Sequence, residues 1–394
     1  MSRSSSKPSL AGLWAHHHGE FRDPHEVVAQ WPAAGDVDPR LLGHRVRGRF
    51  WEALATLEGP LLVTREYEHL VIALAVIEGR RRVSFLRLPH PNGIAVDRAR
   101  GLVHLASTRN PNLVYDLAPC AALVPRAGDG DPEPESVLLP VRARFLPGCL
   151  YIHDLALVGG RLHANAVALN AVAELPEPGG FRTVWWPRCI DGPRGPRFER
   201  NYLQLNSIAA GSDLGDSFFS ASGDRVSARR PGHLNYPVDG RGVIFSGRTR
   251  EVVATGLTRP HSARLVDGEL WVDNSGYGQL GRIVDGRFDP LVQLPGWTRG
   301  LAVARGIAFV GTSRVIPRFR HYAPGVDVDG SESAVHAVEL KSGRILGSLE
   351  WPFGNQIFGI EVCPLPTTGL PFTLPLGGDR VRRLFFQGRT EPMT

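Results

Sequence analysis

The chain has 394 residues, 42% of them hydrophobic and 21% charged, and its formal net charge is +6 at pH 7. These proportions are ordinary for a folded protein with a sizeable core, and they exclude disorder over most of the chain. The positive charge comes almost entirely from arginines spread along the chain beside acidic residues, since lysine occurs only at Lys7 and Lys341, and this argues against a nucleic-acid partner.

The first 45 residues are polar, rich in His and Pro, and without periodicity, so we expect residues 1–45 to form an N-terminal extension. They lack the apolar core of a signal peptide, and no apolar run in the chain approaches the roughly 18 residues of a membrane-spanning helix. The four cysteines are far apart and show no zinc-binding spacing. A cytoplasmic protein with reduced thiols and no membrane contact is the simplest prediction.

The remaining residues, 46–394, are predicted to form one all-β domain. The segment Arg49 to Leu57 has the apolar spacing of a short helix. From Leu61 onward, short apolar runs alternate with breaks that are rich in Gly and Pro. Such runs are typical of many short β-strands.

Six seven-residue segments of this domain are similar to one another and recur at intervals of roughly 40 to 60 residues, which is typical of a propeller or a solenoid. Each has a variable third residue, then a small or short polar residue, then in most copies an apolar, a small and an apolar residue. The segments are 90–96 (HPNGIAV), 151–157 (YIHDLAL), 204–210 (QLNSIAA), 259–265 (RPHSARL), 297–303 (WTRGLAV) and 356–362 (QIFGIEV). Most are followed by a Gly-containing turn and a second strand, as at the start of a propeller blade.

The six segments predict a six-bladed β-propeller in which each segment is the innermost strand of one blade. Little strand-like sequence follows the sixth segment, whereas three strands at 61–88 precede the first. We expect those three strands to join the inner strand near Phe358 and close the ring, which leaves no unpaired sheet edge. A β-sandwich or several small β domains is the alternative, and the blade-sized spacing of the repeats disfavours it.

The third residue of each segment, called the axial position, should face the central axis in every blade. Five of its six occupants are polar; in chain order they are Asn92, His153, Asn206, His261, Arg299 and Phe358. A purely structural position would repeat small apolar residues, as the fifth and sixth residues of the segments do. The pattern therefore predicts a central site surrounded by polar side chains.

Two of these axial residues are histidines, and two are asparagines. His153 and His261, with Asn92 and Asn206, could converge on a divalent metal ion such as Zn, Fe or Ca, because imidazole suits Zn and Fe whereas amide oxygens also suit Ca. No local metal motif accompanies them, so this prediction rests on repeat equivalence alone. A hydrogen-bond network without metal is one alternative, and histidines acting only as acid, base or nucleophile are the other.

Acidic and amide residues beside the axial position extend the candidate site. Asp154 follows His153 and could be a further ligand or could hold an imidazole in one tautomer. Asp273 and Asn274, at the end of a second strand, could act similarly, and Asn274 could also contact a substrate.

Arginines are frequent in or just after the inner-strand and second-strand segments: Arg109, Arg259, Arg264, Arg299 and Arg314. Those that line the channel would favour a carboxylate, phosphate or sulfate ligand through bidentate hydrogen bonds. Arg299 holds an axial position, so we group it with the candidate catalytic residues His153, His261 and Asp154. Tyr151 and Trp297 could form the floor of a binding pocket, and aromatic packing between blades is the alternative.

Several segments resemble a bacterial family of conserved proteins of unknown function with a six-bladed β-propeller fold. They are IHDLA (152–156), LNSIA (205–209), RGLAV (299–303), VGTSR (310–314) and, most specific, RPHSARLVDGELWVDNSGYGQLGRI (259–283). The resemblance covers roughly residues 60 to 362. The chain has Gln204 and Ala263 where the family often has His and Pro, so a metal site implied by the resemblance would shift to His153 and His261 alone. The resemblance also implies an accessory role in biosynthetic clusters, sometimes beside sulfotransferases or tetratricopeptide proteins.

The sequence supports two functional hypotheses. In the first, the protein is an enzyme of a biosynthetic cluster whose axial site, with or without a metal, acts on a small or peptide-borne anionic substrate. The reaction could be hydrolysis, elimination, isomerisation or group transfer. Sulfuryl transfer through His153 or His261 is one variant. In the second, it is a non-catalytic propeller that scaffolds a partner protein. The polar axial residues favour the enzyme, because a scaffold has no need of them.

Overall fold

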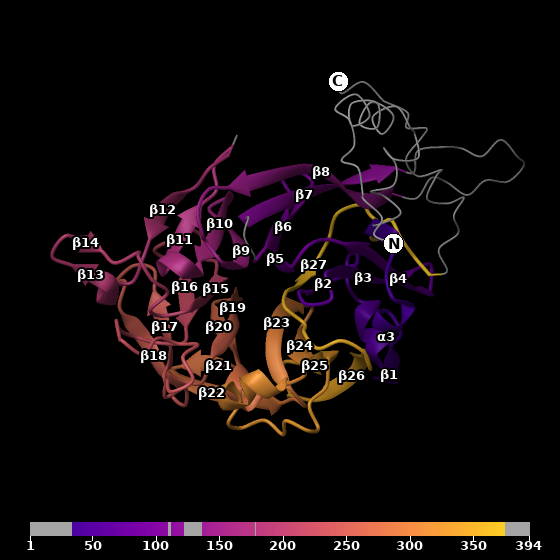
Figure 1. The fold of residues 1–394 in the computed structure, drawn as a ribbon. Helices are drawn as coiled ribbons and strands as arrows, with labels where there is room; N and C mark the ends of the chain where they lie inside the picture. The colour runs from indigo at the N-terminus through magenta and orange to yellow at the C-terminus, as the bar shows by residue number, and fades with distance from the viewer. Residues whose placement is uncertain (1–33, 109–111, 122–135, 178, 375–394) are drawn as a thin grey trace, which may run out of the picture.

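The computed structural model describes residues 34–108, 112–121, 136–177 and 179–374, and it shows a six-bladed β-propeller. Six sheets are arranged as a ring around a common axis (Figure 1). The predicted all-β fold class is confirmed, and each of the six repeated segments contributes the innermost strand of one sheet.

Blades 1 to 3 follow one another along the chain, each running from its inner strand outwards. Blade 1 contains β5 (Pro91–Asp97), β6 (Leu102–Ser107), β7 (Asn112–Ala121) and β8 (Ser136–Leu146). Blade 2 contains β9 (Ile152–Val158), β10 (Arg161–Ala166), β11 (Ala171–Glu174) and β12 (Arg182–Trp185). After a small hairpin of β13 (Asp191–Gly192) and β14 (Gly195–Pro196), blade 3 contains β15 (Leu205–Ala209), β16 (Phe218–Ala221), β17 (Gly242–Ser246) and β18 (Val252–Leu257).

Blades 4 to 6 complete the ring. Blade 4 contains β19 (Pro260–Val266), β20 (Glu269–Asn274), β21 (Gln279–Val284) and β22 (Arg287–Gln293). Blade 5 contains β23 (Trp297–Ala304), β24 (Ile307–Ser313), β25 (Ala334–Glu339) and β26 (Ile345–Glu350), with β1 (Arg45–Gly48) as a fifth, outermost strand. Blade 6 contains β27 (Ile360–Val362), β2 (Leu61–Arg65), β3 (Leu70–Ile77) and β4 (Arg80–Arg87).

The ring closes within blade 6, where strands from distant parts of the chain pair. β27 runs antiparallel to β2, with Leu61 opposite Val362. The three strands before the first inner strand therefore share a sheet with the last one, which removes the open edge that an incomplete blade would have. The expected short helix is α3 (Phe50–Leu54), and it packs Phe50 edge-on against Phe309 of blade 5.

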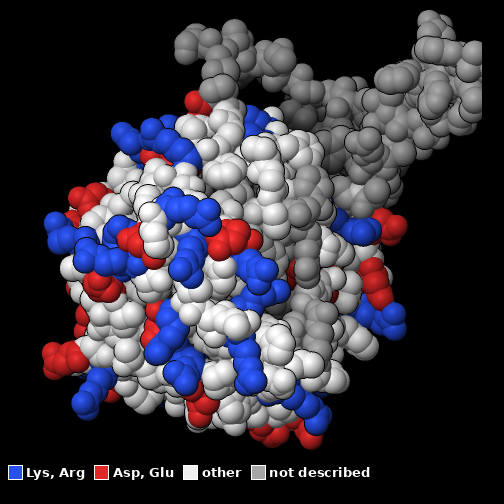
Figure 2. Space-filling model, turned by 60° about the vertical axis from the view of Figure 1, so that its left-hand side comes forward, with Lys and Arg blue, Asp and Glu red and all other residues white. Residues whose placement is uncertain are grey.

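Short 3-10 turns also occur among the described residues. These 3-10 turns are η1 (Pro39–Leu41), η2 (Val167–Leu169), η3 (Arg188–Ile190), η4 (Ser275–Tyr277) and η5 (Pro317–Tyr322). Within the described residues, no helix has the length and apolar character needed to cross a bilayer. Basic side chains on the face shown in Figure 2 are spread over it, with acidic side chains among them.

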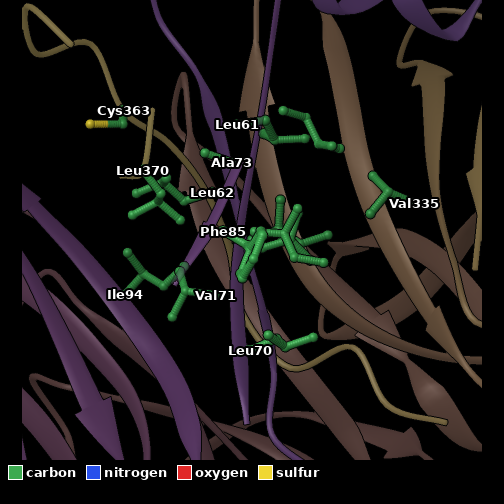
Figure 3. Close-up of a cluster of buried hydrophobic side chains, with 14 of the residues drawn as sticks. Leu61, Leu62, Leu70, Val71, Ala73, Phe85, Ile94, Val335, Cys363 and Leu370 are labelled. Atoms are coloured by element: carbon green, nitrogen blue, oxygen red, sulfur yellow. The ribbon is translucent and has the colours of Figure 1, made fainter. Parts of the chain in front are cut away.

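The hydrophobic core is divided into layers between neighbouring blades. The largest cluster surrounds blade 6, and Figure 3 shows Leu62, Val71 and Phe85 of that blade near Ile94 of β5. Smaller clusters lie between the other blades. Burying each large apolar side chain stabilises the fold by about 1.5–3 kcal/mol, so inter-blade packing holds the axis in place.

A β-bulge recurs in five inner strands at or next to the axial position. In blade 4, His261 pairs with Asp273 and Arg264 pairs with Trp271, so β19 has one more residue between these pairs than β20 has. The same extra residue occurs in blades 1, 2, 3 and 5. A bulge bends its strand and re-aims a side chain, which explains why the axial residue departs from the apolar pattern of its strand.

The residue after the axial position contacts the next blade in all six repeats. Its occupants are Gly93, Asp154, Ser207, Ser262, Gly300 and Gly359. The three polar side chains accept hydrogen bonds from backbone N–H groups of the following blade: Ile208 to Asp154 (3.0 Å), Ala263 to Ser207 (2.8 Å) and Gly300 to Ser262 (2.7 Å). The glycines leave room for that backbone instead. Small residues recur here because adjacent inner strands meet at this point.

Replacing Gly93 with Ala is expected to wedge blades 1 and 2 apart. A Cβ at this position would lie 2.6 Å from the backbone nitrogen of Leu155, which cannot move independently of its strand. We expect the free energy of unfolding, measured with denaturant, to fall by roughly 1–3 kcal/mol. Gly179→Ala is the control, because nothing lies within 4 Å of a Cβ there. Equal stabilities of the two variants would contradict the proposed close contact.

Candidate functional site

A cavity of about 210 Å³ lies at one end of the propeller axis and collects most of the predicted site residues. Seven of them line it: Tyr151, His153, Arg259, His261, Trp297, Arg299 and Arg314. Phe358, the axial residue of the sixth segment, also lines the cavity. The inner strands therefore bring together residues that are up to two hundred positions apart in the sequence.

The two axial asparagines are not among the residues that line this cavity. The side-chain amide of Asn92 donates to the carbonyl oxygen of Ile152 in blade 2. That of Asn206 donates to the carbonyl oxygen of Pro260 in blade 4, at 2.8 Å. Both side chains thus join one inner strand to the next, a structural use of a polar residue at the axial position.

The first residue of the repeated segment lines the cavity in five blades; the sequence predicted three of these residues as site residues but not Gln204 and Gln356. These residues are Tyr151, Gln204, Arg259, Trp297 and Gln356. Three of them, Tyr151, Gln204 and Arg259, have φ angles between 50° and 54°. Such left-handed backbone is uncommon for residues other than glycine and costs of order 1 kcal/mol or more at each position. Its recurrence indicates that the fold holds these side chains in place at the cavity.

His261 is buried and lines the cavity together with Arg259 and Arg299. Its Nδ1 lies 2.9 Å from the hydroxyl oxygen of Ser275, and its ring lies 5.8 Å from that of Trp297. Burial, followed by the positive charges of Arg299, His153 and Arg259, holds the pKa of His261 well below its usual range. The imidazole is therefore neutral at physiological pH and can accept a proton.

His153 is held by aromatic rings on two sides. Its ring centre lies 4.7 Å from that of Tyr151 and 5.5 Å from that of Phe358, with both contacts edge-on. Its backbone N–H donates to the side-chain oxygen of Asn165, at 2.9 Å. Because the ring lines the same cavity as His261, one ligand can reach both imidazoles.

Arg299 and Arg259 are buried cations that contact aromatic rings rather than carboxylates. The guanidinium carbon of Arg299 lies 3.2 Å from the ring centre of Phe358, and that of Arg259 lies 3.7 Å from the ring centre of Tyr322. Among the described residues, neither guanidinium has a carboxylate oxygen within 4.0 Å. Burial lowers the pKa of each to about 10, so both remain charged at neutral pH.

Arg65 shows how the same chain treats a buried arginine with a structural role. Its guanidinium donates to the carbonyl oxygens of Leu41 and Phe353, and its Nε lies 3.8 Å from a carboxylate oxygen of Glu68. Both arginines have one buried nitrogen without a hydrogen-bond partner, Nε in Arg65 and Nη2 in Arg299, but only Arg299 lines the cavity. A buried polar group without a partner costs free energy, so such a group in a cavity indicates a ligand.

Three further predicted residues lie away from this cavity, and Arg109 lies outside the described residues. The carboxylate of Asp154 accepts from Arg264, with Nη1 to Oδ2 at 2.9 Å, and the pair spans blades 2 and 4. Asn274 accepts from the backbone N–H of Thr258 at 2.7 Å and donates to the side chain of Gln279. These contacts account for their polarity within the propeller itself.

The lining also includes residues that lie outside the inner strands. Glu66 and Tyr67 follow β2, Phe319 and Tyr322 belong to η5, and Arg230 lies in the loop between β16 and β17. Arg314 begins the long connection from β24 to β25 that contains η5. Loops of this length are uncommon unless they are functional, and this was the one sequence signal that could have found Tyr322.

A second cavity, of about 360 Å³, is lined by the later halves of the inner strands, beyond the axial positions. The sixth residue of the repeated segment is Ala in four blades but Arg264 in blade 4 and Glu361 in blade 6, and both charged side chains line this cavity. Burial raises the pKa of Glu361 to about 7, with Arg264 opposing the shift. Glu361 thus holds its proton more tightly in the folded protein than in the unfolded chain.

Replacing Glu361 with Gln should stabilise the protein in a pH-dependent way. Between pH 4.5 and about 7, the unfolded chain loses the Glu361 proton while the folded protein keeps it, so this group lowers stability as the pH rises. The free energy of unfolding of the variant should exceed that of wild type by almost nothing below pH 4.5 and by at most about 3 kcal/mol above pH 7. Partial exposure to water reduces that maximum. Denaturant unfolding across this range measures the gain, with Glu52→Gln as an exposed control; a gain that does not depend on pH would contradict the raised pKa.

Comparison with known proteins places the chain in a family. A family model described as "Domain of unknown function (DUF4915)" matches residues 48–374. A search of curated proteins gave no significant match.

Solved structures similar to the chain share little sequence with it. They include a nidogen/laminin complex (11% identity, 77% of this chain and 98% of that chain, TM-score 0.49) and the gluconolactonase XC5397 from Xanthomonas campestris (12% identity, 76% and 87%, TM-score 0.44). A third is streptogramin B lyase (16% identity, 65% and 67%, TM-score 0.36). At such identities the likeness concerns the fold alone.

Proposed function

Because the chain belongs to the DUF4915 family, whose description assigns no function, we propose one from the site: the axial cavity binds a small anionic molecule and moves a proton on it. The observation that carries this proposal is the pair of buried guanidinium groups, Arg259 and Arg299, which face the cavity without a carboxylate partner. A propeller that only scaffolds a partner gains nothing from these charges and bears their desolvation cost.

An anion fits this cavity better than a divalent cation does. Two imidazoles face it, and the described residues contain no cluster of three His, Cys, Asp or Glu side chains that could hold an ion. The amide groups of Asn92 and Asn206 donate to neighbouring blades. Arg259 and Arg299 add positive charge beside His261, which would repel a Zn, Fe or Ca ion. Metal analysis of protein purified without a His tag checks this conclusion, and stoichiometric metal that is lost in a His153→Ala/His261→Ala variant would overturn it.

The chemistry follows from a neutral base beside bound negative charge. A carboxylate held by Arg299 has part of its charge neutralised, which makes a proton on the adjacent carbon more acidic. His261 accepts that proton, and the electron pair of the broken C–H bond is delocalised into the bound carboxylate. Return of a proton to the same carbon, from His261 or from His153, gives hydrogen exchange or, where that carbon is a stereocentre, epimerisation without any further reactant. An elimination starts with the same step.

Thermal unfolding in the presence of simple anions tests the binding part of the proposal. At constant ionic strength, we expect millimolar succinate or phosphate to raise the unfolding temperature of wild type more than that of Arg299→Met. Sulfate and phosphate stabilise many proteins by exclusion from the surface, so only the difference between the two proteins is informative. Equal responses of wild type and variant to every anion would refute an anion site at Arg299.

A further inference from the structure

Building on the proposed function, we propose that the ligand carries two separate anionic groups joined by a short, partly apolar segment, as in a short-chain dicarboxylate. Arg259 and Arg299 each bind one of the two groups. The middle of the ligand then lies beside His261, where the proton is removed.

The two guanidinium groups are held by different parts of the ring. Arg299 stacks on Phe358 of the segment that enters blade 6. Arg259 lies over Tyr322 of η5 and donates from Nη1 to the side-chain oxygen of Gln204, at 2.8 Å. Stacking occupies the face of a guanidinium and leaves N–H donors at its edge for a carboxylate. The cavity therefore offers two anchoring points instead of one.

A single phosphate or sulfate is the alternative ligand for these two guanidiniums. Each guanidinium is already fixed by a contact of its own, Arg259 by Gln204 and Arg299 by the ring of Phe358. Two anionic groups on one molecule satisfy both guanidiniums where they are. Glu66 lines the same cavity and disfavours a third negative group in the ligand.

The space between the anchors suits a short connecting segment. The imidazole of His261 lines the same cavity as both guanidiniums. The rings of Trp297, Tyr322 and Phe358 supply apolar wall. At about 210 Å³, the cavity is smaller than the roughly 300–1,000 Å³ of most drug-sized ligand pockets, so it matches a small molecule better than a peptide.

Calorimetric titration with simple anions tests this inference at constant ionic strength. The probes are succinate and glutarate, with propionate as the monocarboxylate and inorganic phosphate and sulfate as the single anions. We expect wild type to bind at least one dicarboxylate ten times more tightly than propionate. Arg259→Met and Arg299→Met should each remove that tenfold advantage. Arg305→Met, which removes an exposed arginine paired with Glu58, should leave it intact.

The possible outcomes separate this inference from the proposed function. If phosphate or sulfate binds at least as tightly as the dicarboxylates and needs both arginines, the two-point ligand is wrong while the anion site stands. If propionate binds as tightly as the dicarboxylates and depends on only one arginine, the two-point ligand is again wrong and the anion site again stands. If no probe distinguishes wild type from Arg299→Met, both the inference and the proposed function fail. Circular dichroism of each variant establishes that it is folded.

Discussion

The variant Arg299→Met is expected to lose anion binding at least a hundredfold while becoming more stable than wild type. Charge-assisted hydrogen bonds to a buried carboxylate are among the strongest contacts a site can make, so their removal should abolish most of the affinity. The same guanidinium has a buried Nη2 without a hydrogen-bond partner. Replacing a buried, unpaired charge by an apolar side chain of similar length stabilises a fold by roughly 1–3 kcal/mol.

Opposite signs of the two effects distinguish a binding residue from a structural one. Calorimetric titration with succinate measures the first effect, and denaturant unfolding without ligand measures the second. Arg305→Met is the matched control, since its side chain is 58% exposed and its loss should change both quantities little. A less stable Arg299→Met protein would show that the guanidinium supports the fold, and undiminished succinate binding would remove it from the site.

The variant His261→Gln is expected to lose proton-transfer activity by a factor of about 10²–10⁴, the usual contribution of a positioned general base. Gln can keep a hydrogen bond to Ser275 but cannot accept a proton at neutral pH. Exchange of carbon-bound protons of succinate or glutarate for deuterium, followed by NMR, measures the activity. His163→Gln is the control, because His163 is a buried histidine that contacts the carbonyl oxygen of Arg161 and does not line the cavity. Equal exchange rates in wild type and His261→Gln would exclude His261 as the base.

The pH dependence of that activity should differ between free and bound protein. Burial and, after it, the charges of Arg299 and Arg259 keep the pKa of His261 well below its usual range, so kcat/KM should stay constant to a pH clearly below 6.5 before it falls. A bound dianion neutralises those charges and raises the pKa of His261 in the complex. The acid limb of kcat should therefore lie at higher pH than that of kcat/KM. The reverse order would contradict the placement of His261 in one cavity with Arg259 and Arg299.

The repeat explains why part of the site could be predicted from the sequence. His153, His261 and Arg299 occupy equivalent positions beside a recurring bulge, so one alignment of six segments placed all three at the axis. The same alignment could not tell a residue that faces the cavity from one that joins blades. Asn92 and Asn206 are of the second kind, because their amide groups reach the carbonyl oxygens of the next blade.

Other parts of the site depend on contacts that no local pattern contains. Gln204 and Arg259 line the cavity with a left-handed backbone conformation, which residue type alone does not predict for Gln or Arg. Tyr322 comes from a loop without a counterpart in the repeat. The ion pair between Asp154 and Arg264 joins residues of blades 2 and 4, and it accounts for a carboxylate that the sequence placed among the catalytic groups.

Pairing of β2 with β27 has a consequence for how the protein is made. β2 leaves the ribosome early, but its partner Ile360–Val362 follows only after the other five blades. Throughout that interval the nascent chain presents an open hydrogen-bonding edge, which favours association with other chains. Translation that stops before residue 360 would leave this edge permanently uncovered, so a truncated product should aggregate instead of working as a smaller propeller.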